Sequence, residues 1–304
     1  HLQSQNQTSF RLTLEHYYVA VQPMTWVMII YSICGLLLLW KPQLISVQIL
    51  MAGGFGLHVL SLITRSIILS RPPTGTLYET LLFGAAIIMM VGLIILWRNK
   101  HQTLFLSICA LSSAFLLFVS RGFVQGDSLS VLVAVLNTNF WLSTHVTCII
   151  IGYAFCVMAA MVGHGVLLSR APTLEKIMMP LALAALLFTS VGTLLGGIWA
   201  DQSWGRFWGW DPKENGALLI VLWLIWILHG RISGHLKQRG FAAALALTNI
   251  MVALTWFGVN LLGVGLHSYG FISGIAWALG SFILIQFVIV GWLYYRYPKV
   301  TTHG

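Results

Sequence analysis

The chain alternates long apolar runs with short polar connections. A helix needs about 20 predominantly apolar residues to cross a bilayer, and nine runs approach or exceed that length. They lie at 24–40, 43–69, 78–97, 103–119, 141–168, 181–199, 215–230, 241–259 and 274–295. The pattern therefore predicts an all-α, polytopic membrane protein with nine transmembrane helices in a single domain that covers residues 1–304.

The composition supports the bilayer as the solvent for most of the chain. Of its 304 residues, 58% are hydrophobic and 8% are charged, and the mean hydropathy is +0.88. Soluble domains carry about 25% charged residues, so this chain has too few charges to cover a water-facing surface. The formal net charge of +9 comes from scattered basic residues, which argues against a nucleic-acid partner. The chain starts at His1 without a signal peptide, which we interpret as a piece of a longer or processed polypeptide.

The four cysteines all lie inside apolar runs, and no two of them form a CxxC pair. They are Cys34, Cys109, Cys148 and Cys156. Cysteine in such surroundings behaves as a small, polarisable apolar residue, so we expect packing roles rather than disulfides or a redox pair.

The basic residues of the connections predict the orientation of the chain. One set of alternate connections holds ten Lys and Arg, and the other side holds six. Cytoplasmic loops are enriched in Lys and Arg, so we expect the N-terminus outside and the C-terminus in the cytoplasm. Connections 121–141, 204–216 and 260–273 then lie on the outer face, where we expect the chemistry.

The outer connection 204–216 reads WGRFWGWDPKENG, and we expect a loop over about residues 200–215. Asp211 suits a helix N-cap, Pro212 the first helical position and Glu214 the closing residue of a capping box. A capping role for Asp211 is therefore favoured over direct catalysis. The glycine-flanked tryptophans form either an aromatic belt at the headgroup level or a flat platform for a large planar ligand. They are Trp204, Trp208 and Trp210.

Two histidines fall at the predicted outer face. His145 lies near the outer end of its span, and His267 lies in the connection before the last span. Imidazole is a common haem-iron ligand, so two histidines beside a tryptophan-rich wall are consistent with a bis-imidazole haem pocket. For either residue taken alone, a hydrogen-bonded interfacial histidine is the simpler interpretation.

Other histidines lie deeper in the predicted membrane. His229 follows Asp211 by 18 residues, which places it about 25 Å further in along a helix. His58 lies in the middle of the second span, and His164 is an alternative on the inner side. Ionisable residues inside a membrane are candidates for function, so we expect His229 and His58 to ligate a second, transmembrane haem.

The Trp-rich motif followed by His229 resembles the WWD signature of the haem-handling superfamily, to which the CcsA/ResC, CcmF and CcmC proteins of cytochrome c maturation belong. The chain is most similar to the CcsA/ResC type from about residue 50 to residue 295. The segment SRPPTGTLYETLLF at 70–83 is also similar to that type. The resemblance implies that His145 and His267 ligate an external haem and that His229 is a transmembrane ligand. Because no part of the chain resembles the large external domain of CcsB, the C-terminal part of a fused CcsB–CcsA protein is one interpretation.

The resemblance also implies a reaction. Haem b is presented at the outer face and joined covalently to the CxxCH segment of apocytochrome c. This is the activity of a holocytochrome c synthase, or haem lyase, and it relies on positioning rather than on acid–base groups. Trp204, Trp208, Trp210 and Asp211 would form the haem platform, and Arg206 is the first candidate to pair with a haem propionate.

The partners implied are a CcsB/ResB-type subunit or fused domain, apocytochrome c, a thiol-reducing thioredoxin-like protein and the lipid bilayer. The membrane implied is the bacterial inner membrane, with the active face towards the periplasm or exterior, or alternatively the thylakoid membrane.

Three other functions are compatible with parts of the pattern. A bis-His membrane cytochrome that transfers electrons would also contain paired histidines. A haem chaperone would present haem and leave its attachment to another subunit. A solute transporter would show internal repeats and broken helices with polar residues at the midplane, and the halves of this chain show no convincing repeat.

Overall fold

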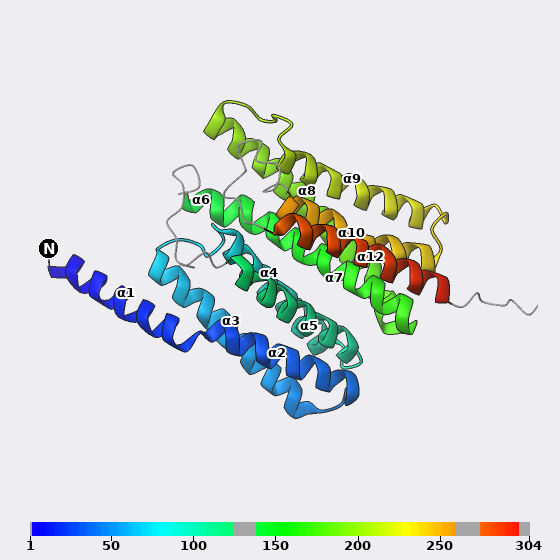
Figure 1. The fold of residues 1–304 in the computed structure, drawn as a ribbon, viewed down its shortest axis with the longest axis horizontal. Helices are drawn as coiled ribbons and strands as arrows, with labels where there is room; N and C mark the ends of the chain where they lie inside the picture. Colours follow the sequence, from blue (N-terminus) through cyan, green and yellow to red (C-terminus); the bar gives the residue numbers. More distant parts are fainter. Residues whose placement is uncertain (1, 124–137, 259–273, 298–304) are drawn as a thin grey trace, which may run out of the picture. The chain divides into compact units, whose positions relative to one another are not determined.

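The computed structural model describes residues 2–123, 138–258 and 274–297, and all regular secondary structure in these ranges is helical (Figure 1). The chain divides into two compact units, His1–Ile150 and Ile151–Gly304, and the division falls within helix α7. We call them the N-terminal unit and the C-terminal unit. The all-α prediction is confirmed, whereas the prediction of one domain over the whole chain stays a prediction.

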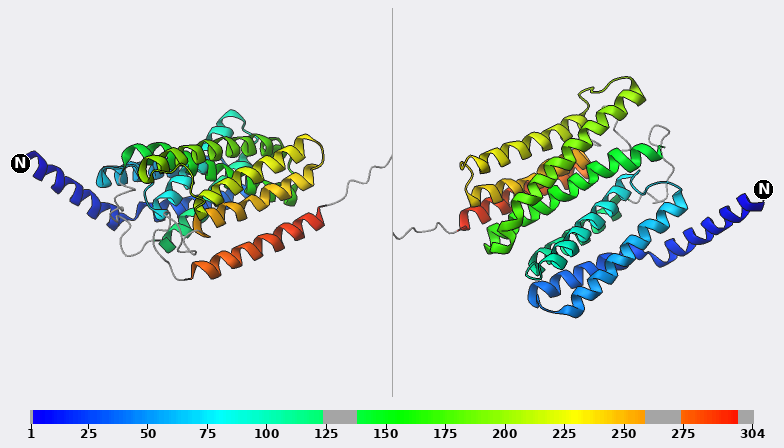
Figure 2. Two further views of the ribbon diagram at one scale, coloured as in Figure 1. Left: turned by 90° about the horizontal axis from the view of Figure 1, so that it is seen from above. Right: turned by 180° about the vertical axis from the view of Figure 1, so that it is seen from behind.

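The N-terminal unit is built on helices that run side by side (Figure 2). They are α1 (Leu2–Val21), α2 (Pro23–Trp40), α3 (Ile45–Leu69), α4 (Leu77–Arg98) and α5 (Thr103–Ser120). Helix α2 packs on α3 and α5, and α4 packs on α5. Glycines allow these close approaches, because a Cβ on Gly54 of α3 would lie 2.8 Å from the side chain of Ile30 on α2.

The N-terminal unit ends in short helical pieces. The 3₁₀ turn η1 (Arg121–Phe123) follows α5. On the far side of residues 124–137, α6 (Asn139–Trp141) and the π-helical turn η3 (Leu142–Val146) lead directly into α7 (Thr147–Ser169).

The C-terminal unit contains α7 after Ile150 and four further long helices. They are α8 (Pro172–Trp204), α9 (Pro212–Ile232), α10 (Gln238–Ala253), which continues into the π-helical turn η4 (Leu254–Gly258), and α12 (Ile275–Arg296). Helix α9 packs on α8 and α10, and α10 packs on α12. Gly152 and Gly163 bring α7 against its neighbours: a Cβ on Gly152 would lie 2.8 Å from the backbone nitrogen of Thr189 on α8.

Nine helical segments of the described chain are long and apolar enough to cross a membrane, as predicted. Their lengths differ most from the prediction in two places. The first segment begins at Ser9 rather than at residue 24, since α1 leads into α2 through Gln22, whose φ is 47°. Helix α8 covers 33 residues rather than 181–199, which corresponds to about 50 Å and exceeds the ~30 Å hydrocarbon core. Helix α8 is thus longer than the hydrocarbon core is thick, and it ends at Trp204, the first residue of the Trp-rich motif.

All four cysteines lie in these helices as free thiols, as predicted. The orientation of the chain across the membrane stays a prediction. The words "outer" and "inner" below refer to that predicted orientation.

Candidate functional site

The Trp-rich connection is shorter than predicted. Trp204 is the last residue of α8, so the non-helical segment covers only Gly205–Asp211. Gly205 adopts a left-handed φ of 67°, which terminates α8 in the way typical of a C-terminal glycine. Trp210 adopts a φ of 55°, which is uncommon for any residue other than glycine. The chain thus reverses between α8 and α9 within one tightly shaped turn.

The predicted capping box at the start of α9 is confirmed. The Asp211 side chain accepts a hydrogen bond from the Lys213 nitrogen at 2.8 Å. Glu214 accepts from the Asp211 nitrogen at 3.1 Å and also from the Gly209 nitrogen at 2.8 Å. Asp211 is buried. The Asp-Pro-Lys-Glu run therefore fixes both the start of α9 and the backbone of the tryptophan-bearing turn.

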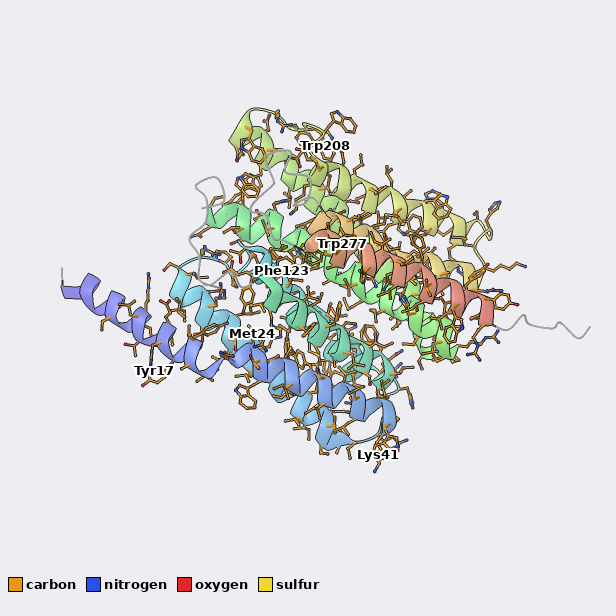
Figure 3. All side chains as sticks on the ribbon, viewed as in Figure 1. Tyr17, Met24, Lys41, Phe123, Trp208 and Trp277 are labelled. Atoms are coloured by element: carbon orange, nitrogen blue, oxygen red, sulfur yellow. The ribbon has the colours of Figure 1, made fainter. Side chains whose placement is uncertain are left out.

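The indole rings of Trp208 and Trp210 are not coplanar, and the role of the three tryptophans as a haem platform stays a prediction. The rings of Trp208 and Trp210 are 6.1 Å apart and inclined at 86°, an edge-to-face arrangement. Trp208 lies on the connection between α8 and α9 (Figure 3). Trp210 is 70% exposed, whereas Trp208 and Trp204 are half-buried. The motif thus contains two indole rings nearly perpendicular to each other, of which the Trp210 ring is exposed on the surface of its unit.

Two neighbouring side chains hold this turn against α8 and against its own backbone. The Phe207 ring covers Gly197 of α8, where an added Cβ would lie 2.6 Å from the ring. The Arg206 guanidinium lies directly over Gly209, in the place that a side chain there would occupy. The packing of Phe207 on α8 was not predicted from the sequence. The only sequence feature that relates to it is Gly197 of α8, which leaves space for the ring. The role of Arg206 as a propionate partner stays a prediction.

The start of α9, just after the turn, packs against η4. A Cβ on Gly216, in the first turns of α9, would lie 2.7 Å from the Thr255 hydroxyl oxygen. Thr255 belongs to the π-helical turn η4, in which the Trp256 and Phe257 rings stack at 5.5 Å. The segment 259–273 follows η4 directly. His267 lies in that segment, outside the described residues.

His145 lies in the other π-helical turn, η3. It is half-buried, and Trp141 just before it is buried with its ring edge-to-face against Phe140 at 4.9 Å. π-Helical turns are rare and occur frequently at functional sites. The sequence analysis placed His145 at the outer end of its span but gave no sign of this irregular turn.

The deeper histidines have contrasting surroundings. His58 is fully buried in the N-terminal unit, where its Nδ1 lies 3.3 Å from the Tyr31 hydroxyl. His229 is exposed in the last turn of α9, and its Nδ1 bonds the Ile225 carbonyl at 3.0 Å. His164 is half-buried, with its Nδ1 bonded to the Ala160 carbonyl at 2.8 Å. In His229 and His164 the Nδ1 bond leaves Nε2 as the nitrogen with a lone pair, as metal ligation requires.

A buried charge cluster that was not predicted lies at the outer end of the N-terminal unit. Glu79 of α4 is fully buried and accepts from Arg65 Nε at 2.9 Å and from Arg71 at 2.7 Å. Its second oxygen also accepts from the Gly75 and Thr76 nitrogens at 2.8 and 3.1 Å. The spacing Thr-x-x-Glu is a capping-box signature and would have located Glu79, but not its two arginine partners.

The predicted site residues fall in both units. His145 and His58 belong to the N-terminal unit, whereas His229 and the Trp-rich connection belong to the C-terminal unit. His267 lies outside the described residues, and His229 and His58 belong to different units, so both proposed pairings stay predictions.

Comparison with known proteins decides the family. The model for the cytochrome c assembly protein family matches residues 74–267. This chain belongs to that family. Protein NrfI of Wolinella succinogenes is 30% identical over 235 residues, which cover 71% of this chain and 25% of NrfI. The cytochrome c biogenesis protein CcsA of Prochlorococcus marinus is 29% identical over 71% of this chain and 80% of that protein. CcsA of Chlamydomonas reinhardtii is 30% identical over 74% of this chain and 69% of that protein.

These likenesses confirm the resemblance to CcsA-type proteins and a role in cytochrome c biogenesis, and the nine apolar helices of the described residues indicate an integral membrane protein. The chain spans 80% of CcsA from Prochlorococcus marinus but only a quarter of NrfI. The matched region of the cytochrome c assembly protein family contains His145, the Trp-rich connection, His229 and His267, and it leaves out His58.

Proposed function

We propose that this member of the cytochrome c assembly protein family presents haem b at the outer face of its membrane and attaches it to apocytochrome c. One observation carries the proposal. The Trp-rich turn is fixed by Glu214 and is followed by Gly216, which packs against η4, and η4 leads directly into the segment that bears His267. The turn therefore leads into a helix start that packs against η4, and the histidine-bearing segment follows η4 in the chain. The indoles of the turn supply apolar, aromatic surface of the kind that lines ligand sites.

The axial ligands that we propose for this haem are His145 and His267. Bis-imidazole ligation would occupy both axial positions of the iron. His145 fits this role because it lies on a π-helical turn, half-buried and beside aromatic side chains. Trp204, Trp208 and Trp210 would cover the macrocycle, with Asp211 holding their turn in place, and Arg206 would pair with a propionate.

The proposed reaction needs little chemistry from the chain itself. The CxxCH segment of apocytochrome c brings two thiols and a histidine, which replaces one axial imidazole. Each thiol S–H adds across a vinyl C=C, so that sulfur bonds one carbon, the hydrogen is taken by the other, and no oxidant is consumed. The residues of this chain bind, orient and shield the reacting groups, which is the positioning role of a synthase.

Within the membrane we propose His229 as a ligand of a second haem. The Nδ1 bond to Ile225 fixes the ring and leaves Nε2 for iron, and the exposed side chain has room for a macrocycle. His58 fits less well. His58 is fully buried, and Gly54, one turn away on α3, packs closely against Ile30 and Tyr31 of α2. This packing leaves little space for a macrocycle. The second axial ligand then comes from His164 or from a partner chain.

We also propose the partners and the membrane that the family resemblance implies. The partners are a CcsB/ResB-type subunit or fused domain, apocytochrome c and a thioredoxin-like protein that keeps its thiols reduced. The membrane is the bacterial inner membrane or the thylakoid membrane.

The test of the external site is the haem content and absorption spectrum of the full chain, purified in mild detergent together with its partner subunit. We expect His145→Gly and His267→Gly to lose the low-spin bis-imidazole spectrum and to regain it with added imidazole. His235→Gly is the matched control, since His235 is exposed in another connection and bonds only to Ser233 there. Unchanged spectra in both glycine variants would exclude the external site.

Two further measurements separate the alternatives. Haem staining of a co-expressed CxxCH reporter distinguishes attachment from presentation alone: haem bound to the full complex without any stained reporter would indicate a chaperone. For the transmembrane site, His229→Ala is expected to remove a separate haem signal that His58→Leu leaves intact. Loss of that signal in His58→Leu instead would assign the ligand to His58.

A further inference from the structure

The connection between α3 and α4 is hydrogen-bonded both to the buried charge cluster and to the π-helical turn of His145. Glu79 binds Arg65, Arg71 and the Gly75 and Thr76 nitrogens, and so fixes the connection between α3 and α4. Thr74 lies in that connection and is 2% exposed. Its hydroxyl donates to the Leu142 carbonyl, 68 residues away, at 3.3 Å. All of these residues belong to the N-terminal unit.

The Leu142 carbonyl is the acceptor on which η3 depends. It accepts the backbone N–H of Thr147, five residues ahead, which is the bond that defines a π-helical turn. It also accepts the Thr147 hydroxyl at 2.9 Å, in addition to the Thr74 hydroxyl. Two side-chain hydroxyls, one of them from a distant connection, therefore support a turn type that is seldom stable unaided.

The π-helical turn sets the direction of His145. A π turn holds one residue more than an α turn, so it rotates the residues before it relative to those after it. His145 lies inside this turn, three residues after Leu142 and two before Thr147. A relaxation of η3 to α-helix would turn the His145 ring away from its present direction around the helix.

We propose that Thr74, held in place by the cluster centred on Glu79, is a positioning residue that fixes the π-helical turn and so the direction of the His145 imidazole. The inference rests on the proposed function, in which His145 is an axial ligand. Thr74 itself does not touch the haem. Its effect passes through the Leu142 carbonyl.

The test compares three substitutions in the full complex. Thr74→Val keeps the shape of the side chain and removes the hydroxyl, whereas Thr74→Ser keeps the hydroxyl. Thr189→Val is the matched control, because Thr189 is equally buried and its hydroxyl bonds only carbonyls of its own helix α8. The measurements are retained haem, the low-spin spectrum, and the imidazole concentration that restores that spectrum.

For Thr74→Val we expect haem retention to fall about two- to tenfold, which is the range that loss of one buried hydrogen bond produces. Added imidazole should restore the low-spin spectrum, because the defect lies in ligand direction. Thr74→Ser and Thr189→Val should match the parent protein.

The other outcomes overturn the inference in distinguishable ways. Parent-like haem in Thr74→Val, with loss of haem in His145→Gly, would refute the positioning role and leave the proposed function intact. An equal loss in Thr74→Val and Thr189→Val that imidazole does not restore would show general destabilisation instead. An unchanged spectrum in His145→Gly would overturn both the proposed function and this inference.

Discussion

Glu79→Gln tests how much stability depends on the buried charge cluster. Glu79 is the only carboxylate in the salt bridges of the described residues, and it serves both Arg65 and Arg71. The substitution keeps the shape of the side chain but removes its charge. If the amide oxygen takes the position that accepts from Arg71, Gly75 and Thr76, the amide NH₂ faces Arg65 Nε–H, and donor meets donor.

The expected cost follows from this geometry. Removal of one partner from a buried ion pair costs about 3–5 kcal/mol, because the remaining charge stays buried without compensation. The two backbone bonds to Gly75 and Thr76 can survive in the glutamine variant, so the lower end of the range applies. We expect Glu79→Gln to lower the free energy of unfolding by about 3 kcal/mol, a large share of the roughly 5–15 kcal/mol typical of folded domains.

The assay is reversible unfolding in mixed detergent micelles, followed by tryptophan fluorescence. Glu175→Gln is the control, since Glu175 is half-buried in the first turn of α8 and takes part in no salt bridge of the described chain. Adding Arg71→Met to Glu79→Gln should recover part of the loss, because it removes one of the uncompensated charges. A Glu79→Gln variant within about 1 kcal/mol of the parent, or a double variant with fully additive losses, would refute the reasoning.

Three glycine substitutions test the packing elsewhere. Gly163→Ala should cost about 1–3 kcal/mol in the same unfolding assay, because its Cβ would lie 2.5 Å from the backbone oxygen of Ala242 on α10. Gly56→Ala, with no atom within 4 Å of the added carbon, should instead gain about 0.5–1 kcal/mol. Gly209→Ala should leave the unfolding free energy nearly unchanged, because the flexible Arg206 side chain can move aside, but it should lower haem retention if Arg206 binds a propionate. Equal stability changes in Gly163→Ala and Gly56→Ala would contradict this account of the helix contacts.

The nine spans could be predicted from the sequence because bilayer thickness imposes a length on every apolar run. The ends of the spans were less predictable, since apolarity does not stop a helix. Helix α8 continues through Asp201 and Gln202 to Trp204, where Gly205 in the left-handed conformation ends it. Backbone chemistry rather than hydropathy therefore set that boundary.

The local structure of the Trp-rich motif was predictable where it depends on neighbours in sequence. The Asp211–Glu214 capping box is such a case, because both partners lie within four residues. The angle between Trp208 and Trp210 was not predictable, because it depends on the φ of 55° at Trp210 and on the bonds that Glu214 makes to the turn. The sequence shows how many indoles there are but not how their planes are inclined.

The same contrast between local and distant partners explains why the hydrogen bond from Thr74 to the π-helical turn of His145 could not be predicted. The tripeptide Thr74–Gly75–Thr76 has no unusual composition, and its significance comes from a carbonyl 68 residues away from Thr74. The π-helical turn η3 combines a local donor, the Thr147 hydroxyl, with the distant hydroxyl of Thr74, and the distant partner cannot be read from the sequence around His145. If His145 is a ligand, its direction is fixed by an ion-paired connection on another helix pair. Substitutions at Glu79 or Thr74, which do not touch the haem, should then alter the haem spectrum in addition to the free energy of unfolding.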